Sequence, residues 1–266
     1  MITFNNLGNL GRLGNQMFQY ASLRGIAANR GFDFCIPPEK SFGMFDPNVR
    51  YSSNNIHNTF NLSHVKCDTS THRLVQESGY HFDQELFDTC EDNVDLYGYF
   101  QSEKYFKHIE DEIRKDFKFS QELVDQCVEF IKDIDSSGEI ISLHIRRGDY
   151  LQLQSFHPVP SIQYYIEALK QFPDVPVFIF SDDTDWCSMR QEFNSDRFLI
   201  SESNSVDFDM CLMSMCKYHI IANSSFSWWG AWLSDSKKVI APKVWFGPSL
   251  SDKNTNDLYC DSWKIL

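Results

Sequence analysis

Two adjacent arginines stand directly after a continuous apolar run, and their side chains are suited to binding phosphate. Arg146 and Arg147 follow residues 140–145, with His144 just before them and Asp149 just after. A guanidinium group is planar and offers a fork of N–H donors that matches phosphate or pyrophosphate oxygens. In an extended chain, His144 lies on the same face as Arg146. Asp149 can orient an arginine or act as a base; the alternative is an Arg–Asp pair that only ties down a loop.

A second group of polar residues precedes an aromatic segment near the end of the chain. Asn223, Ser224 and Ser225 come directly before FSWWGAWLS at 226–234, which has helical character. Ser224 or Ser225 can cap this helix and leave its first backbone N–H groups to an anion, to which the helix dipole adds up to ~1 kcal/mol. The alternative is an ordinary helix cap. The three tryptophans of the segment are more typical of a packed core than of a ligand stack.

A third candidate region is the glycine-rich N-terminal segment GNLGRLGNQMFQYA. Its glycines stand at positions 8, 11 and 14, which differs from GxGxxG and does not support a dinucleotide-binding fingerprint. A backbone without side chains, as at Gly14, can approach a ligand closely, and Asn15 and Gln16 at the start of the next helix can donate to that ligand. The alternative is a tight turn.

The elements that position these residues alternate regularly from about residue 139. We expect strands at 140–145, 175–183, 197–201, 219–222 and 237–242, and helices at 161–172, 184–193, 208–216 and 226–234. This alternation predicts βαβ units and a mostly parallel sheet. Open α/β sheets bind ligands beyond the carboxyl ends of their strands. The segments RRGDY, SDD (181–183) and NSSFSWW each stand at the end of such a strand, so we expect them at one edge of the sheet. This position favours ligand binding over an Arg–Asp pair that only ties down a loop.

The first 138 residues have a weaker pattern. We expect strands at 2–5 and 32–37 and helices at 15–29, 103–119 and 121–134, and we assign no element within 41–100. The segment DSSGE at 135–139 resembles a domain boundary. We therefore predict two domains, 1–138 and 139–266.

Composition excludes several classes of protein. The 266 residues are 42% hydrophobic, which supports a folded core, and the net charge of −13 disfavours nucleic-acid binding. No apolar run reaches the roughly 18 residues of a spanning helix, and the N-terminus lacks the features of a signal peptide. The eight cysteines are scattered without CxxC or zinc spacing, so we expect reduced thiols rather than disulfides or a metal site.

Taken together, three blocks of this sequence resemble the α-1,2-fucosyltransferase family, glycosyltransferase family 11. They are GRLGNQMFQYA (11–21), HIRRGDY (144–150) and NSSFSWWGAWL (223–233). This family uses GDP-fucose and includes bacterial lipopolysaccharide and capsule enzymes as well as the animal blood-group H transferases. The paired-arginine block is shared with α-1,6- and protein O-fucosyltransferases, so by itself it does not fix the linkage.

The resemblance implies a GT-B fold, in which two Rossmann-like domains face each other across a cleft. The C-terminal domain, 139–266, would bind GDP-fucose, and the N-terminal domain, 1–138, most of the acceptor. It also implies inversion at the anomeric carbon without an essential divalent metal.

Individual roles carried over from the family fall mostly on the C-terminal domain. Arg146 would bind the β-phosphate and stabilise GDP as the leaving group, His144 would contact the nucleotide or its diphosphate, and Arg147 would support the site. The segment with Asn223, Ser224 and Ser225 would bind pyrophosphate at the helix start.

Further roles fall on both domains. Gly14 and Asn15, across the cleft, would approach the fucose–phosphate region. Asp182 or Asp183 would meet guanine or ribose. We take Arg146, Asp149 and Asn15 as the catalytic candidates; Asp149 is a candidate base by type, and late proton transfer to phosphate or water is the alternative.

The expected activity is an inverting transfer of L-fucose from GDP-β-L-fucose to the 2-hydroxyl of a terminal β-galactose. The alternatives are a fucosyltransferase of other regiochemistry and a non-catalytic sugar- or nucleotide-binding protein of the same fold. No Golgi anchor precedes the catalytic blocks. We therefore expect a bacterial-type cytoplasmic enzyme of surface-glycan synthesis, either free or peripheral at the inner membrane through a lipid-linked acceptor.

Overall fold

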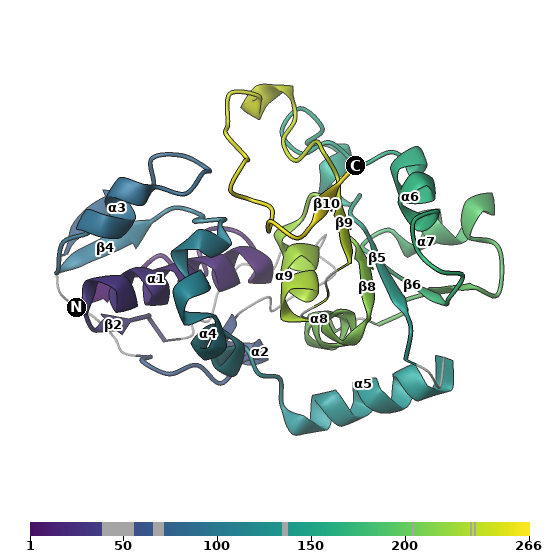
Figure 1. Ribbon diagram of the computed structural model, residues 1–266, viewed down its shortest axis with the longest axis horizontal. Helices are drawn as coiled ribbons and strands as arrows, with labels where there is room; N and C mark the ends of the chain where they lie inside the picture. The colour runs from purple at the N-terminus through teal and green to yellow at the C-terminus, as the bar shows by residue number, and fades with distance from the viewer. Residues whose placement is uncertain (39–55, 66–71, 135–137, 204, 235, 237) are drawn as a thin grey trace. The chain divides into compact units, whose positions relative to one another are not determined.

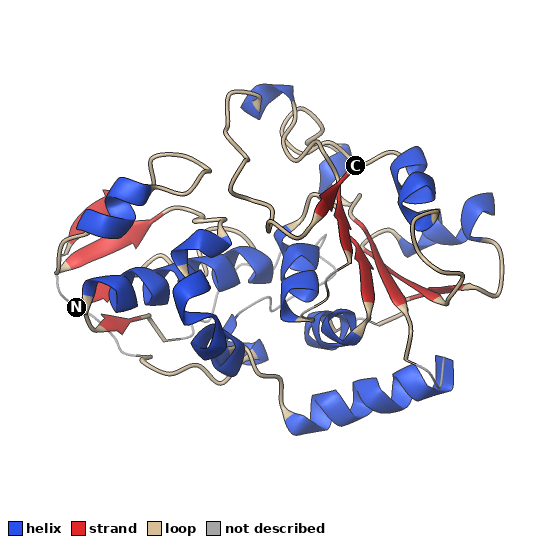
Figure 2. Ribbon diagram, in the orientation of Figure 1, coloured by secondary structure: helices blue, strands red, loops and turns tan. Residues whose placement is uncertain are grey.

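The computed structural model describes residues 1–38, 56–65, 72–134, 138–203, 205–234, 236 and 238–266. These residues form two units, one of residues 1–119 and 253–260 and the other of residues 120–252 and 261–266 (Figure 1). Each unit contains a parallel β-sheet with helices packed against it (Figure 2). The predicted α/β class is therefore confirmed.

The sheet of the second unit has six strands in the order β10-β9-β8-β5-β6-β7, and every pairing is parallel. Its strands are β5 (Ile141–Ile145), β6 (Val177–Ser181), β7 (Phe198–Ile200), β8 (Tyr218–Ile220), β9 (Val239–Ala241) and β10 (Lys264–Ile265). The five predicted strands are confirmed. The sixth, β10, is a two-residue exposed edge strand whose sequence has no period to detect.

Helices cover both faces of this sheet. They are α5 (Gln121–Ile134), α6 (Ile162–Leu169), α7 (Thr184–Ser188), α8 (Val206–Met215) and α9 (Ser225–Leu233), with short 3₁₀ turns η3 (Asp149–Leu151), η4 (Gln191–Phe193) and η5 (Pro248–Leu250). Figure 1 shows α6 and α7 on one face of the sheet and α8 and α9 on the other. The four helices predicted between the strands are therefore present.

The central strand β5 distributes its residues between these two faces. Ile141, Leu143 and Ile145 pack into the buried cluster that includes residues of α6 and α7. Because successive side chains of a strand point to opposite faces, His144 faces α8 and α9. The chain visits β6 and β7 on one side of β5 and then crosses to β8 on the other, so the strand order reverses between β5 and β8. Ligands bind at such switch points in open α/β sheets.

The first unit is built on a smaller sheet with the order β2-β1-β4-β3, in which all pairs are parallel. The strands are β1 (Ile2–Thr3), β2 (Phe34–Cys35), β3 (Arg73–Gln76) and β4 (Val94–Tyr97). The helices are α1 (Leu13–Arg30), α2 (Ile56–Thr59), α3 (Gln84–Thr89) and α4 (Glu110–Asp116), with 3₁₀ turns η1 (Glu103–Tyr105) and η2 (Lys107–Ile109). The predicted strands near residues 2–5 and 32–37 and the helix at 15–29 are confirmed.

The continuous helix predicted at 103–119 is wrong, because the segment forms η1, η2 and α4 in succession. Phe106 leaves the helical region, with φ −131° and ψ 2°. Neighbouring residues on a regular helix point about 100° apart. The break at Phe106 lets both Tyr105 and Phe106 be fully buried.

The two units divide at Phe119 and Ser120, whereas the sequence places the domain boundary at 138/139. The reason is that α5 packs on strand β6 and helix α8 of the second unit: the ring of Phe130 meets Phe178 of β6 at 5.2 Å and Phe208 of α8 at 5.8 Å, both edge to face. Residues 135–137 of the predicted boundary lie outside the described part of the chain. Within that part, no helix is long and apolar enough to cross a membrane.

Candidate active site

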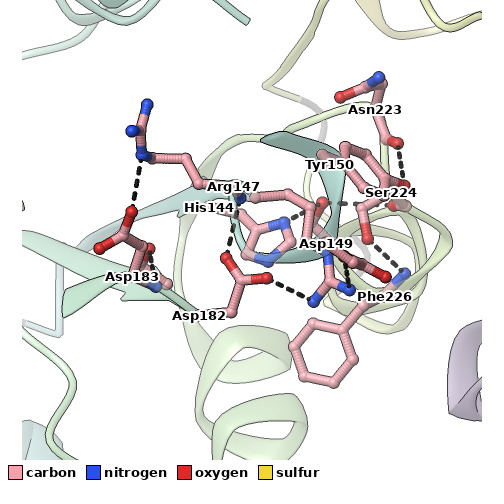
Figure 3. A network of polar contacts seen from close by, with 12 residues as sticks. His144, Arg147, Asp149, Tyr150, Asp182, Asp183, Asn223, Ser224 and Phe226 are labelled. Carbon is pink, nitrogen blue, oxygen red and sulfur yellow. Dashed lines mark hydrogen bonds and ion pairs between the residues drawn. The ribbon is translucent and has the colours of Figure 1, made fainter. Parts of the chain in front are cut away.

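Arg146 leaves the carboxyl end of β5 and is held between two carboxylates. Its Nη2 donates to Asp149 Oδ1 at 2.5 Å, and its Nη1 donates to Asp182 Oδ2 at 2.8 Å (Figure 3). The ring of Tyr150 lies 5.2 Å from the guanidinium carbon, close enough for a cation–π contact. The Arg146 side chain is 13% exposed and that of Asp149 is 40% exposed. Asp149 is therefore placed to orient the arginine, and its catalytic role stays a prediction.

Asp182 explains why a glycine separates the arginines from Asp149. Its Oδ1 accepts from the backbone N–H of Arg147 at 2.8 Å, while its Oδ2 accepts from Arg146. A Cβ at Gly148 would lie 2.5 Å from Asp182 Oδ2. A side chain at position 148 would therefore displace the carboxylate that anchors Arg146.

The Arg147 side chain points away from Arg146 and contacts residues that follow the neighbouring strand, β6. Its Nε donates to Asp183 Oδ2 at 2.9 Å, and its guanidinium carbon lies 4.0 Å from the ring centre of Trp186. Asp183 also caps α7, because its Oδ1 accepts from the Trp186 N–H at 3.2 Å. Asp182 and Asp183 are thus both bound to arginines, and their contact with guanine or ribose stays a prediction. The sequence did not single out Trp186.

His144 is buried against the start of α9 and is kept neutral. Its Nδ1 lies 2.8 Å from Ser227 Oγ, and its ring centre is 5.8 Å from that of Phe226. Burial, reinforced by the positive charge of Arg146, lowers the pKa of His144 from 6.5 to about 3. The sequence analysis did not identify Ser227. The signal that could have identified it is a serine in the first turn of a helix that packs against the strand carrying His144.

The start of α9 has the predicted serine cap. Ser224 has extended backbone, and its Oγ accepts from the Phe226 N–H at 3.3 Å, so Ser225 is the first helical residue. Asn223 ties the loop down, because its Nδ2 donates to the carbonyl oxygens of Pro158 at 2.9 Å and Trp245 at 3.0 Å. The capping prediction is confirmed, and Asn223 has a structural function in this loop.

The tryptophans of α9 are core residues, as predicted. Trp228 and Trp229 are fully buried and Trp232 nearly so. The rings of Trp228 and Trp229 meet edge to face at 5.0 Å, and Trp263 packs on Trp228 at 5.4 Å. This aromatic cluster holds α9 in place, so that the backbone N–H groups of its first turn lie at the carboxyl edge of the sheet.

Hydrogen bonds join the two polar segments at the switch point between β5 and β8. Tyr150 Oη donates to the Asn223 carbonyl oxygen at 3.1 Å, and His144 contacts Ser227. The structure therefore brings the paired-arginine block and the serine-capped helix together at one carboxyl edge. Guanidinium and backbone N–H donors at such an edge are suited to a diphosphate.

Gly14 and Asn15 belong to the first unit, in the first turn of α1. Asn15 Oδ1 accepts from Gln101 Nε2 at 2.7 Å, which leaves the amide nitrogen as the group that Asn15 can present as a donor. Gly11 has φ +77°, and a Cβ there would lie 2.0 Å from Asn15 Nδ2. Gln101, which follows β4, was missed by the sequence because nothing local links it to Asn15.

No group of three or more His, Cys, Asp or Glu side chains that could hold a metal ion occurs among the described residues. The seven cysteines in the described part of the chain are buried free thiols.

Comparison with known proteins gives one family over nearly the whole chain. The family described as Glycosyl transferase family 11 matches residues 2–266. An α-1,2-colitosyltransferase of Escherichia coli is 31% identical over 264 residues, covering 89% of this chain and 90% of that protein. The galactoside α-(1,2)-fucosyltransferase 2 of Sus scrofa is 25% identical over 259 residues, covering 86% of this chain and 69% of that protein.

The O-antigen biosynthesis glycosyltransferase WbnK of Escherichia coli matches a shorter region. It is 35% identical over 182 residues, which is 63% of this chain and 59% of that protein.

Solved structures share the fold at low sequence identity. The NodZ α-1,6-fucosyltransferase soaked with GDP-fucose superposes with a TM-score of 0.57 at 16% identity, covering 91% of this chain and 94% of NodZ. POFUT1 in complex with GDP gives a TM-score of 0.54 at 13% identity, covering 90% and 97%. The likeness confirms the predicted GT-B fold class, with one parallel α/β sheet in each unit.

Proposed function

Because this chain belongs to glycosyl transferase family 11, the α-1,2-fucosyltransferase family, we propose that it transfers L-fucose from GDP-β-L-fucose to the 2-hydroxyl of a terminal β-galactose, with inversion at the anomeric carbon. The observation that carries the proposal is that the segment of Arg146 and the serine-capped start of α9 lie at one sheet edge, joined by the His144–Ser227 and Tyr150–Asn223 hydrogen bonds. That edge lies at the switch point of the second sheet, where a nucleotide diphosphate is bound in open α/β folds.

The donor diphosphate is bound by Arg146 and by the first N–H groups of α9. The fucosyl group departs through a state with oxocarbenium character, so negative charge builds on the leaving diphosphate. Fixed donors stabilise that charge more in the transition state than in the ground state. Asp182 keeps Arg146 in place, Arg147 braces the loop, and Asn15 of the first unit donates from its amide nitrogen to the fucose–phosphate region.

The acceptor hydroxyl must lose a proton, and Asp149 is the proposed base. Its carboxylate bonds to Arg146 Nη2 and is the more exposed of the two that hold this arginine. A phosphate oxygen that takes over Nη2 replaces Asp149 Oδ1 in this contact, and we propose that the carboxylate then accepts from the acceptor hydroxyl. The alternative route is late transfer of the proton to phosphate or water.

In this proposal the second unit binds the donor and the first unit binds most of the acceptor. The chain acts in the cytoplasm on a surface-glycan precursor, and a lipid-linked acceptor brings it to the inner membrane. Co-sedimentation with vesicles that carry a galactose-terminated lipid-linked glycan, compared with plain vesicles, tests the membrane step.

The first experiment mixes the purified 266-residue chain with GDP-fucose and lactose. We expect release of GDP and formation of 2′-fucosyllactose, identified by NMR. A product of another linkage would replace the proposed regiochemistry. Binding of GDP-fucose by calorimetry without turnover on any of a panel of β-galactosides would indicate a non-catalytic binding protein.

A second candidate donor is GDP-colitose. The relative that is 31% identical over 89% of this chain is named an α-1,2-colitosyltransferase, and colitose is fucose without its 3-hydroxyl. Equimolar GDP-fucose and GDP-colitose in one reaction, with the two products separated by mass, decides between them through the ratio of kcat/KM values.

A further inference from the structure

Two buried serine–histidine pairs lie in the second unit, and their hydrogen bonds differ in direction. His219 Nδ1 lies 2.7 Å from Ser142 Oγ, and His144 Nδ1 lies 2.8 Å from Ser227 Oγ. Burial lowers the pKa of each imidazole from 6.5 to about 3. Each ring is therefore neutral near pH 7 and carries a single N–H.

The tautomer of His219 follows from its second contact. Its Nε2 lies 3.1 Å from the carbonyl oxygen of Cys216, and a carbonyl oxygen can only accept a hydrogen bond. The proton of His219 is therefore on Nε2, and its Nδ1 accepts from the hydroxyl of Ser142.

The same reasoning gives the opposite tautomer for His144. Ser227 Oγ donates to the carbonyl oxygen of Ser224 at 3.3 Å, and a hydroxyl group has one hydrogen to give. Both contacts of Ser227 are satisfied together when His144 Nδ1 holds the proton and donates to Ser227 Oγ. His144 Nε2 then carries a lone pair and can only accept.

We propose that Ser227 is a positioning residue that holds His144 in the Nδ1–H tautomer, so that His144 Nε2 accepts a hydrogen bond from a hydroxyl of the bound donor nucleotide and does not donate to its diphosphate. This inference rests on the proposed function for the identity of the donor. It narrows the role of His144, because a diphosphate oxygen has no proton to offer Nε2 whereas the ribose and fucose hydroxyls that flank the diphosphate do. The N–H groups of guanine lie one sugar further from the diphosphate that Arg146 is proposed to bind.

In this arrangement, hydrogen-bond donors and a hydrogen-bond acceptor at the sheet edge bind different parts of the donor nucleotide. Arg146 and the N–H groups of α9 supply donors to the phosphates, and His144 supplies an acceptor. Two consecutive hydrogen bonds link His144 to the residue that caps α9. His144 Nδ1–H donates to Ser227 Oγ, and Ser227 Oγ–H donates to the carbonyl oxygen of Ser224. The hydroxyl acceptor and the phosphate-binding helix start are thus fixed by one set of hydrogen bonds.

The tautomer can be read directly from the free protein. The full chain is labelled with ¹⁵N-histidine, and two-bond ¹⁵N–¹H correlation spectra identify which ring nitrogen is protonated; His144→Gln and His219→Gln assign the two buried rings. We expect His144 as Nδ1–H and His219 as Nε2–H, so that the second ring is an internal reference. A His144 spectrum of the Nε2–H type would overturn the proposal.

Three ligands then separate the hydroxyl contact from the phosphate contact. GDP or GDP-fucose is expected to shift the His144 Nε2 resonance in the direction of an accepted hydrogen bond, and inorganic pyrophosphate is expected to leave it in place. An equal shift with pyrophosphate, or no shift with either nucleotide at saturation, contradicts the hydroxyl contact. If calorimetry detects no GDP binding, the proposed function and the hydroxyl contact fail together, while the tautomer is still decided by the free protein.

Ser227→Ala tests the positioning role, and Ser234→Ala is its matched control. Ser234 Oγ also donates to a carbonyl three residues back, that of Ala231 at 2.6 Å, at the other end of the same helix. We expect Ser227→Ala to lose the single tautomer and to raise KM for the donor about tenfold with a smaller change in kcat, since one neutral hydrogen bond contributes about that factor. Ser234→Ala should change neither. An unaltered tautomer and KM in a folded Ser227→Ala protein would contradict the assignment.

Discussion

Replacing Gly148 with alanine tests whether the position of Arg146 depends on Asp182. The added Cβ would lie 2.5 Å from Asp182 Oδ2 and 3.1 Å from its Cγ. An ordinary contact begins at 3.4 Å, so the carboxylate oxygen must retreat by 3.4 − 2.5 = 0.9 Å. The Arg146 Nη1–Oδ2 distance is 2.8 Å, and a retreat of this size breaks that hydrogen bond unless the arginine follows.

Either response misplaces the guanidinium that we propose binds the β-phosphate. A hydrogen bond between charged groups contributes about 1.5–3 kcal/mol. If that stabilisation is lost in the transition state, kcat/KM falls about tenfold to a hundredfold. The assay is initial-rate GDP release from GDP-fucose with lactose, together with thermal melting of each variant.

The matched control is Gly31→Ala at the end of α1. Gly31 has φ +69°, and its Cβ would meet nothing within 4 Å. An alanine there costs about 1 kcal/mol of stability through the left-handed backbone, and it leaves kcat/KM unchanged. Gly148→Ala with wild-type activity, or with an activity loss matched by a large fall in melting temperature, would refute the reasoning.

Four further outcomes are expected. Arg146→Ala should lower kcat/KM by roughly a hundredfold to a thousandfold with the melting temperature retained, because it removes a donor to the developing charge; near-normal activity would exclude the phosphate role. Two variants test the Asn15–Gln101 hydrogen bond, and both should lower kcat/KM about tenfold. Asn15→Asp keeps the oxygen that accepts from Gln101 but removes the amide N–H, and Gln101→Leu removes the donor that holds Asn15. A loss of activity with only one of them would show that the two residues do not act together. The free energy of unfolding should fall as pH decreases from about 6.5 toward about 3, because His144 and His219 are then protonated in the unfolded chain and not in the folded protein. Two protons correspond to a loss of about 2.7 kcal/mol per pH unit. His219→Gln should reduce this dependence of the free energy of unfolding on pH, measured by melts at several pH values. Transfer should persist within about twofold in excess chelator, because the proposed positive charge comes from Arg146 and a helix start; loss that added Mg²⁺ or Mn²⁺ restores would contradict this.

The second sheet was predictable from the sequence because its strands are buried on both faces. Strands such as β5 and β6 read as continuous apolar runs, and their parallel order places the residues after them on one edge. The first sheet was harder for the opposite physical reason. Strand β3 is the sequence RLVQ with Leu74 53% exposed, so it has no buried face to produce a pattern.

The residue types of the site were also predictable, but their pairings were not. The sequence indicates that Arg146 and Ser224 follow parallel strands and so lie at the same edge of the sheet, since that depends on strand direction alone. It does not indicate that Asp182 holds Arg146, that Gln101 holds Asn15 or that Ser227 meets His144. Each of these contacts joins residues 35 or more positions apart and depends on side-chain direction, which no local pattern encodes.

The charges around the arginines determine how a chain with net charge −13 would bind the proposed diphosphate at this edge. Arg146 and Arg147 contact three carboxylates, those of Asp149, Asp182 and Asp183, so the formal charge of these five paired side chains is 2 − 3 = −1. The ion-paired groups therefore supply no net positive charge of their own, and the proposed binding depends on the direction of fixed N–H donors. The three carboxylates are not equivalent, because Asp149 is 40% exposed whereas Asp182 is 12% and Asp183 is 26% exposed. Asp182 can keep its hold on Arg146 while a phosphate takes the position of Asp149. In the proposed mechanism, Asp149 is thus the carboxylate of the three that orients the arginine before the donor binds and accepts the acceptor's proton afterwards.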